Sequence, residues 1–136
     1  MSKRPHVLVV DDDVQILGLF MRTLTRANYV VTGTTSGADA LDLAQRASPS
    51  LVILDLSMPD PDGFEMLKYL HTKKPDVKVL VMSGAIQGVI LNAATLFGAV
   101  ATLEKPVPPE SLLQAVDRVL SAEGRDHTFS AGRVLR

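Results

Sequence analysis

The stretch LVILDLSMPDPDG, residues 51–63, joins a strongly apolar run to a series of turn-forming residues. Four apolar residues lead into a single carboxylate, Asp55, after which prolines, aspartates and a glycine crowd the chain. A short, uninterrupted apolar run is typical of a strand that is covered on both faces, as in a parallel sheet. Asp55 therefore either caps a turn at the end of a buried strand or is a reactive group at that strand's carboxyl end.

Short apolar runs alternate with segments of helical periodicity along most of the chain. This alternation predicts five βα units, and hence an α/β domain whose parallel sheet has right-handed crossovers. We expect this domain over residues 5–121, followed by a flexible tail over 122–136 and no effector domain. The expected strands are 7–10, 29–32, 51–54, 77–82 and 100–103, and the expected helices are 14–26, 37–47, 63–71, 87–97 and 109–121.

The composition is that of an ordinary globular domain. The 136 residues suffice for one core, and the net charge of −1 gives no global attraction to nucleic acid or to an anionic membrane. The absence of cysteine excludes disulfides and thiol chemistry and is compatible with the cytoplasm. Residues 79–103 carry no formal charge, but glycines and polar side chains interrupt them. A membrane span needs about 20 predominantly apolar residues, so we expect a strand, a helix and a strand there instead.

Polar residues follow or end four of the five expected strands. Asp11 and Asp12 follow the first, Asp55 the third and Ser83 the fourth, and Lys105 comes shortly after the fifth. Ligands of open parallel sheets bind at the carboxyl ends of the strands, so these residues are expected to converge on one pocket. Clustered carboxylates repel one another and favour a hard cation such as Mg²⁺. A carboxylate can also act as the nucleophile toward phosphorus.

Four segments resemble the receiver domain of two-component response regulators. They are VLVVDDD at 7–13, ILDLSMPDPDG at 53–63, VLVMSG at 79–84 and GAVATLEKPV at 98–107. They occur in the order and at the spacing of that family, over nearly the whole chain. The resemblance implies a flavodoxin-like (βα)5 fold, a doubly wound parallel sheet with strand order 2-1-3-4-5.

The resemblance also implies a metal site and a phosphoacceptor. Asp55 would accept the phosphoryl group, and the cofactor would be Mg²⁺ or Mn²⁺. Asp12 would touch the metal directly and Asp11 mainly through water. Asp55 and the backbone carbonyl of Ser57 would complete the set of metal ligands.

Two further residues of the resemblance would contact the phosphoryl oxygens. Ser83 would bind one through its hydroxyl and Lys105 would pair with another, and the Lys105–Pro106 bond would be cis. The resemblance also makes Ser83 and residue 102 the switch positions, but Thr102 stands where the family usually has an aromatic ring. An aromatic rotamer switch is therefore excluded, and a smaller shift of the loop after Ser83 remains the alternative.

The function that follows is a phosphorylation-dependent signalling receiver, not an enzyme acting on other substrates. The donor would be a histidine kinase or a histidine phosphotransfer protein, and the output a downstream protein partner or a homodimer. The surface that binds this partner or the second copy is expected on the helix over 87–97, the last strand and the last helix. Direct contact with nucleic acid or a membrane is not expected. On the helix over 87–97, Leu91 and Leu96 are expected to face outward, while the inward face comprises Ile90, Ala93, Ala94 and Phe97.

Two other functions compete with this interpretation. In a haloacid-dehalogenase-like phosphatase, Asp11 and Asp13 would form the nucleophile motif, and the phosphoryl group would go to Asp11 rather than Asp55. That family would want Thr or Val where this chain has Gln15, and Glu110 and Asp117 are too scattered for its second acidic pair. The second competing function is a binding module that is never phosphorylated. The intact set of acidic residues argues against it.

Overall fold

The computed structural model describes residues 4–58, 63–84 and 93–121. Five strands and four helices have defined bounds in this part of the chain, and residues 93–96 add a short helical segment. In chain order the elements are β1 (His6–Val10), α1 (Val14–Arg26), β2 (Val30–Thr34), α2 (Gly37–Ala47), β3 (Leu51–Asp55), α3 (Gly63–Lys73), β4 (Lys78–Ser83), β5 (Ala101–Glu104) and α5 (Pro109–Ser121).

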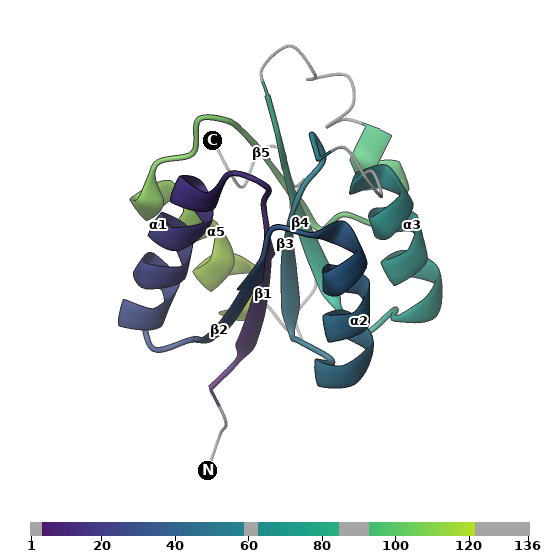
Figure 1. Ribbon diagram of the computed structural model, residues 1–136, viewed down its shortest axis with the longest axis horizontal. Helices are drawn as coiled ribbons and strands as arrows, with labels where there is room; N and C mark the ends of the chain where they lie inside the picture. The colour runs from purple at the N-terminus through teal and green to yellow at the C-terminus, as the bar shows by residue number, and fades with distance from the viewer. Residues whose placement is uncertain (1–3, 59–62, 85–92, 122–136) are drawn as a thin grey trace.

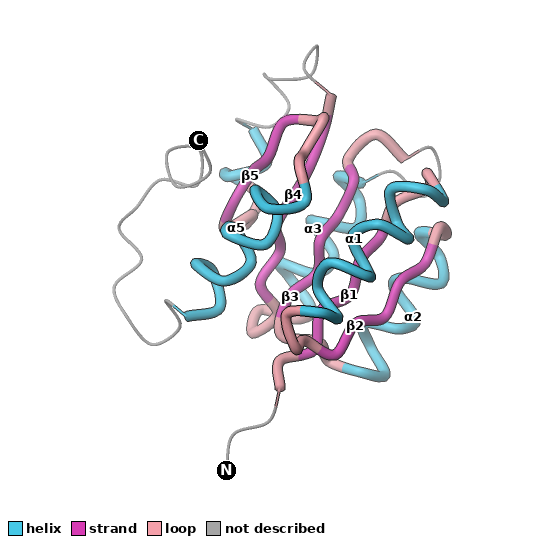
Figure 2. The backbone as a smooth tube through the Cα atoms, turned by 90° about the vertical axis from the view of Figure 1, so that its left-hand side faces the viewer, coloured by secondary structure: helices cyan, strands magenta, loops and turns pink. Residues whose placement is uncertain are grey.

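The five strands form one parallel sheet in the order β2-β1-β3-β4-β5, which confirms the predicted fold. Helices α1 and α5 cover one face, and α2 and α3 cover the other (Figure 1). Figure 2 shows the sheet from the side of α1 and α5, with the strands lying side by side in the order β5, β4, β3, β1 and β2. The chain crosses from β1 to β2, returns past β1 to β3 and then proceeds to β5, so the strand order reverses between β1 and β3.

Each face of the sheet carries its own hydrophobic core, because side chains alternate along a strand. Val7 and Val9 of β1 pack toward α1 and α5, whereas Leu8 and Val10 pack toward α2 and α3. All five residues of β3 are buried. The uninterrupted apolar runs of the sequence therefore correspond to strands that are covered on both faces.

Local signals set the helix bounds closely. Helix α1 begins after Asp13, whose side chain caps it, and its buried residues Leu17, Phe20 and Leu24 recur at helical spacing. The bounds of α1, α2 and α5 are those predicted, and the other elements agree to within two residues where they are described. Residues 87–92 of the expected helix over 87–97 lie outside the described residues, as does the expected tail over 122–136.

Phe97 departs from its predicted inward position. Ala94 is fully buried and Leu96 is 84% exposed, as expected, but Phe97 is 41% exposed. Its ring lies edge-on to that of Phe64 in α3, with 5.7 Å between centroids and 82° between planes. The turn ends just there, with Gly98 at a φ of +102°, so Phe97 no longer continues the helical face. Ile90 and Leu91 lie outside the described residues.

In the part of the chain that the structure describes, every helix is too short or too polar to cross a membrane.

Candidate functional site

The carboxyl ends of the strands bring the predicted polar residues to one edge of the sheet. Val10 pairs with Leu54, so Asp11 directly follows β1 beside the end of β3, where Asp55 stands. The pairing of β3 with β4 and of β4 with β5 continues this edge to Ser83 and Glu104. The crossovers of a parallel sheet thus gather residues that are far apart in the sequence.

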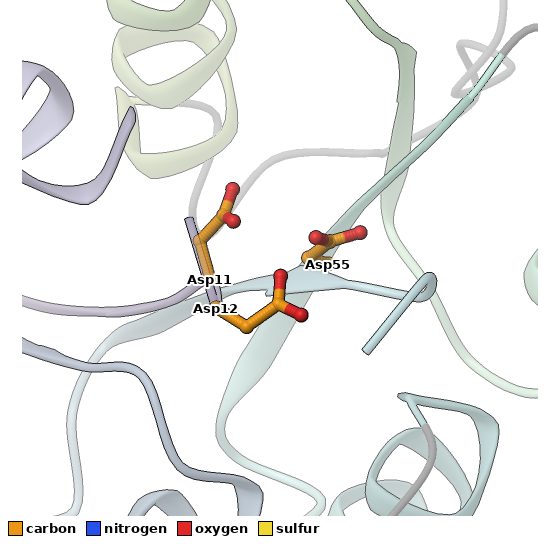
Figure 3. Close-up of side chains that lie close together, drawn as sticks. All are labelled: Asp11, Asp12 and Asp55. Carbon is orange, nitrogen blue, oxygen red and sulfur yellow. The ribbon is translucent and has the colours of Figure 1, made fainter. Parts of the chain in front are cut away.

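Three carboxylates lie close together at this edge. One oxygen each from Asp11, Asp12 and Asp55 falls within 4.8 Å of the others. Figure 3 shows the Asp11 and Asp12 side chains just after the end of β1 and that of Asp55 at the end of β3, with the Asp12 carboxylate turned toward Asp55. Asp11 and Asp55 are buried, whereas Asp12 is exposed. Like charges at this separation repel, and the repulsion requires a cation or a proton nearby.

Lys105 supplies one cation. Its Nζ lies 3.0 Å from Oδ2 of Asp55 and 3.2 Å from Oδ2 of Asp11, so it bridges two buried carboxylates. Burial alone would lower the pKa of the Lys105 ammonium, but the hydrogen bond to Asp55 and the charge of Asp11 raise it above its usual range. Lys105 is therefore charged at neutral pH, as a group that pairs with a phosphoryl oxygen must be.

Asp11 carries an oxygen without a hydrogen bond. Its Oδ2 is fully buried and has no hydrogen-bond partner among the described residues, although the charge of Lys105 lies nearby. Burial raises the pKa of this carboxyl above its ordinary value, and only in part do the Asp13 backbone N–H and Lys105 counteract that effect. The ionised form of Asp11 is thus costly in this structure and would be favoured by a second cation.

The donor set fits a hard divalent cation. Its atoms are all carboxylate oxygens, which suit Mg²⁺ and Mn²⁺ and not softer metals. Asp11, Asp12 and Asp55 each offer one oxygen to such a cation, and these oxygens lie within 4.8 Å of one another. Water would fill the remaining positions, as is usual for Mg²⁺. The carbonyl of Ser57 as a further ligand stays a prediction.

The backbone after β3 fixes the Asp55 carboxylate. The N–H of Ser57 donates to Oδ1 of Asp55 at 2.8 Å, and the N–H of Leu56 donates to the Met82 carbonyl of β4 at 2.8 Å. Gly63, the first residue of α3, lies so near that an added Cβ would come 2.5 Å from Cα of Leu56 and 2.9 Å from the Asp55 carbonyl oxygen. The sequence identified Gly63 as a turn residue that starts the helix. Its close approach to the Asp55 backbone is a tertiary feature that the local pattern does not contain.

Ser83 and Lys105 are neighbours across the β4–β5 edge. Ser83 is fully buried at the end of β4, and its carbonyl accepts the N–H of Lys105 at 2.7 Å. The Lys105–Pro106 peptide bond is cis, as the resemblance implied. Thr102 lies half-buried in β5 and pairs with Val81 of β4.

Two of the residues named for a phosphatase, Asp13 and Asp117, lie outside the carboxylate cluster. Asp13 caps α1 rather than joining the carboxylate cluster. Asp117 accepts a hydrogen bond from the phenol of Tyr29, which follows α1 at the opposite end of the sheet. The second acidic pair that this alternative needs is therefore not supplied by Asp117.

Chemically, the site can direct one carboxylate at an incoming electrophile while cations neutralise the developing charge. Asp55 is held by the Ser57 N–H and by Lys105, and two further carboxylates can hold a metal ion beside it. A carboxylate nucleophile, an ammonium group and a hard divalent cation together suit phosphoryl transfer to an aspartate.

The sequence and the fold of this chain are similar to those of known proteins. The family model of the response regulator receiver domain matches residues 7–117. The chain is 34% identical over 116 residues to protein CcdB of Bacillus subtilis, covering 85% of this chain and 97% of that protein. It is 30% identical over 120 residues to chemotaxis protein CheY of Thermotoga maritima, covering 88% and 98%. Among solved structures, chemotaxis response regulator CheY4 of Vibrio cholerae superposes with a TM-score of 0.80 at 31% identity, over 86% of this chain and 99% of that one.

Other relatives are much longer. The chain is 36% identical to transcriptional regulatory protein GlrR of Escherichia coli over an alignment of 141 residues. This alignment covers all of this chain and only 31% of the relative. The chain thus spans about a third of that relative's length.

Proposed function

This chain belongs to the response regulator receiver domain family of two-component signalling proteins, and from this premise we propose that phosphorylation of Asp55 switches it. The observation that carries the proposal is the position of the Asp55 carboxylate. It shares the Lys105 ammonium with Asp11, and one of its oxygens lies within 4.8 Å of oxygens of Asp11 and Asp12. We place the receiver over residues 5–121.

The proposed step is transfer of a phosphoryl group from a phosphohistidine. An Asp55 oxygen forms a bond to phosphorus as the P–N bond to the donor imidazole breaks, and the imidazole leaves with the electron pair and takes up a proton. A divalent cation held by Asp11, Asp12 and Asp55 would neutralise charge on the transferring oxygens. Lys105 is already paired with Asp55 and would follow the added charge onto a phosphoryl oxygen.

Phosphorylation changes the local charge enough to drive a switch. A phosphoryl group adds about −1.5 to −2 charges and three acceptor oxygens. Shifting two states from 1:99 to 99:1 needs roughly 5.5 kcal/mol of differential stabilisation. Hydrogen bonds to charged groups contribute about 1.5–3 kcal/mol each, so new contacts from Ser83 and Lys105 are of the required order. Because position 102 is a threonine, the readout proceeds without an aromatic rotamer.

The partners would be proteins. A histidine kinase or histidine phosphotransfer protein would donate the phosphoryl group, and a downstream protein or a second copy of the chain would receive the signal. The exposed Leu96, next to β5 and α5 in the chain order, marks the surface that we assign to this contact. Relatives such as GlrR are transcriptional regulators, but the receiver itself would contact no nucleic acid or membrane and would act in the cytoplasm.

The test is to locate the phosphoryl group. Incubation with a small acyl phosphate and Mg²⁺ should add one phosphoryl group to the wild type, as measured by intact-protein mass spectrometry. Asp55→Asn should abolish the addition, and Asp39→Asn, which removes an exposed carboxylate of α2, should leave it unchanged. Peptide mapping after borohydride trapping should place the group at Asp55. Finding it at Asp11 would favour the phosphatase alternative, and finding none would favour the binding module.

A further inference from the structure

Asp13 lies beside the carboxylate cluster but is not one of its three members. Its backbone N–H donates to Oδ1 of Asp11, with 2.9 Å between nitrogen and oxygen. The other oxygen of Asp11, Oδ2, is near the Lys105 charge and has no hydrogen-bond partner in the described part of the chain. The backbone of Asp13 therefore provides the directional contact that orients the buried Asp11 carboxylate.

The side chain of Asp13 holds that backbone in place. Its Oδ1 accepts the N–H of Gln15 at 2.9 Å and that of Ile16 at 3.2 Å, which makes it the N-cap of α1. Its carbonyl accepts the N–H of Leu17 at 2.9 Å. The cap requires an extended backbone, here with φ −86° and ψ 110°. With both its side chain and its carbonyl bound to the first turn of α1, Asp13 presents its N–H to Asp11 in a fixed direction.

We propose that Asp13 is a positioning residue, which sets the Mg²⁺ affinity of the site by holding Asp11 through its helix cap. The proposal rests on the function proposed above, because it requires the cation site. Mg²⁺ demands near-ideal octahedral geometry, and ligands that are held in advance have less freedom to lose on binding. Residues that orient metal ligands typically account for about 10- to 100-fold in metal affinity.

Three substitutions separate the cap from the charge. Asp13→Ala removes both, whereas Asp13→Asn and Asp13→Ser keep an oxygen that can cap the helix and remove the charge alone. We expect Asp13→Ala to weaken Mg²⁺ binding by about tenfold. Asp13→Asn and Asp13→Ser should remain within about threefold of the wild type, because the exposed charge is screened by solvent.

Ser36→Ala is the matched control for loss of a cap. Ser36 is the N-cap of α2, and its hydroxyl accepts the N–H of Asp39 at 3.2 Å. This substitution should lower stability much as Asp13→Ala does, because one cap is lost in each. It should leave Mg²⁺ binding unchanged, since the bonds of Ser36 do not involve Asp11.

Two measurements should be made on the full chain. Isothermal titration calorimetry gives the dissociation constant for Mg²⁺. Amide hydrogen exchange by NMR in the presence of a chelator reports the N–H of residue 13 directly. That amide should exchange slowly in the wild type, in Asp13→Asn and in Asp13→Ser, and faster in Asp13→Ala, whether or not metal is present.

The proposal is wrong if Asp13→Ala binds Mg²⁺ as tightly as the wild type, or if Asp13→Asn and Asp13→Ser lose as much affinity as Asp13→Ala. It is also wrong if Ser36→Ala loses as much. If the wild type binds no Mg²⁺, or Asp55→Asn binds it equally well, the proposed function has failed and this inference fails with it. If the wild type binds and Asp55→Asn does not, an unexpected result with Asp13 overturns this inference alone.

Discussion

Replacing Lys105 by methionine tests whether this lysine holds the two buried carboxylates together. Its Nζ lies 3.0 Å from Asp55 Oδ2 and 3.2 Å from Asp11 Oδ2, and its side chain is 20% exposed, as against 1% and 0% for the two aspartates. Lys105→Met keeps most of the apolar stem and removes the ammonium. Two buried carboxylates then face each other without a cation.

The expected loss of stability is about 3 kcal/mol at neutral pH in the presence of a chelator. At an effective dielectric constant near 20, each ion pair at these distances has a Coulomb energy of about 5 kcal/mol, from which the cost of dehydrating the ammonium must be subtracted. Removing one partner of a buried ion pair typically costs about 3–5 kcal/mol. We take the lower end because Asp11 can bind a proton and so relieve part of the repulsion.

The loss should depend on both pH and Mg²⁺. Without Lys105 the pKa of Asp11, which burial already raises, should rise further. An acid whose pKa is higher in the folded state binds more protons when folded, so the variant should gain stability relative to the wild type as the pH falls. Mg²⁺ should restore more stability to the variant than to the wild type, since it supplies the missing positive charge; a ligand at 100 times its dissociation constant adds about 2.7 kcal/mol.

Urea denaturation followed by circular dichroism, with chelator or with Mg²⁺ and at several pH values, measures these effects. Lys78→Met is the control, because Lys78 is a half-buried lysine at the start of β4, at the amino end of the strands and away from the site. It should show a small loss that is independent of Mg²⁺. A loss in Lys105→Met that is the same with chelator and with Mg²⁺ would refute the electrostatic reasoning and assign Lys105 a packing role.

Three further substitutions test other parts of the structure. Because the folded pKa of Asp11 is raised, its ionisation lowers stability as the pH rises above the ordinary value of 3.8, so Asp11→Asn should be more stable than the wild type at neutral pH in chelator. Urea denaturation should show this gain and the loss of any added stability from Mg²⁺. Burial and Asp117 raise the pKa of the Tyr29 phenol, which in the unfolded chain ionises near 10.0. The wild type should therefore lose stability above that pH, and Tyr29→Phe should lose less, as measured by alkaline denaturation. Leu96→Glu should change the unfolding free energy by no more than about 0.5 kcal/mol, because the side chain is 84% exposed. It should nonetheless weaken self-association or partner binding of the phosphorylated chain in analytical ultracentrifugation.

The elements and the candidate residues of the site could be predicted from the sequence because their signals are local. Apolar runs, helical spacing and caps such as Asp13 act within a few residues, and they placed α1, α2 and α5 correctly. The polar residues at strand ends identified Asp55 and Lys105 before any contact was known. Strand order was different: it came from the resemblance to a family, since alternation of strands and helices alone does not determine it.

Phe97 shows where local patterns fail. Its position on a helical wheel is inward, but the helix ends at that point and the ring packs at the surface against Phe64 of α3. Gly63 is a second example. The sequence identifies it only as a turn residue, whereas in the fold its Cα packs so closely against the backbone of Asp55 that a Cβ would not fit.

The sequence by itself thus determined the type of the described elements, their bounds to within two residues, and which side chains could carry chemistry. Tertiary structure alone decided that Lys105 bridges Asp55 and Asp11 and that both of these carboxylates are buried. The physical reason is range. Hydrogen bonds of a helix and the alternation of a strand depend on near neighbours, whereas Lys105 and Asp55 are 50 residues apart and meet only because parallel strands align their carboxyl ends.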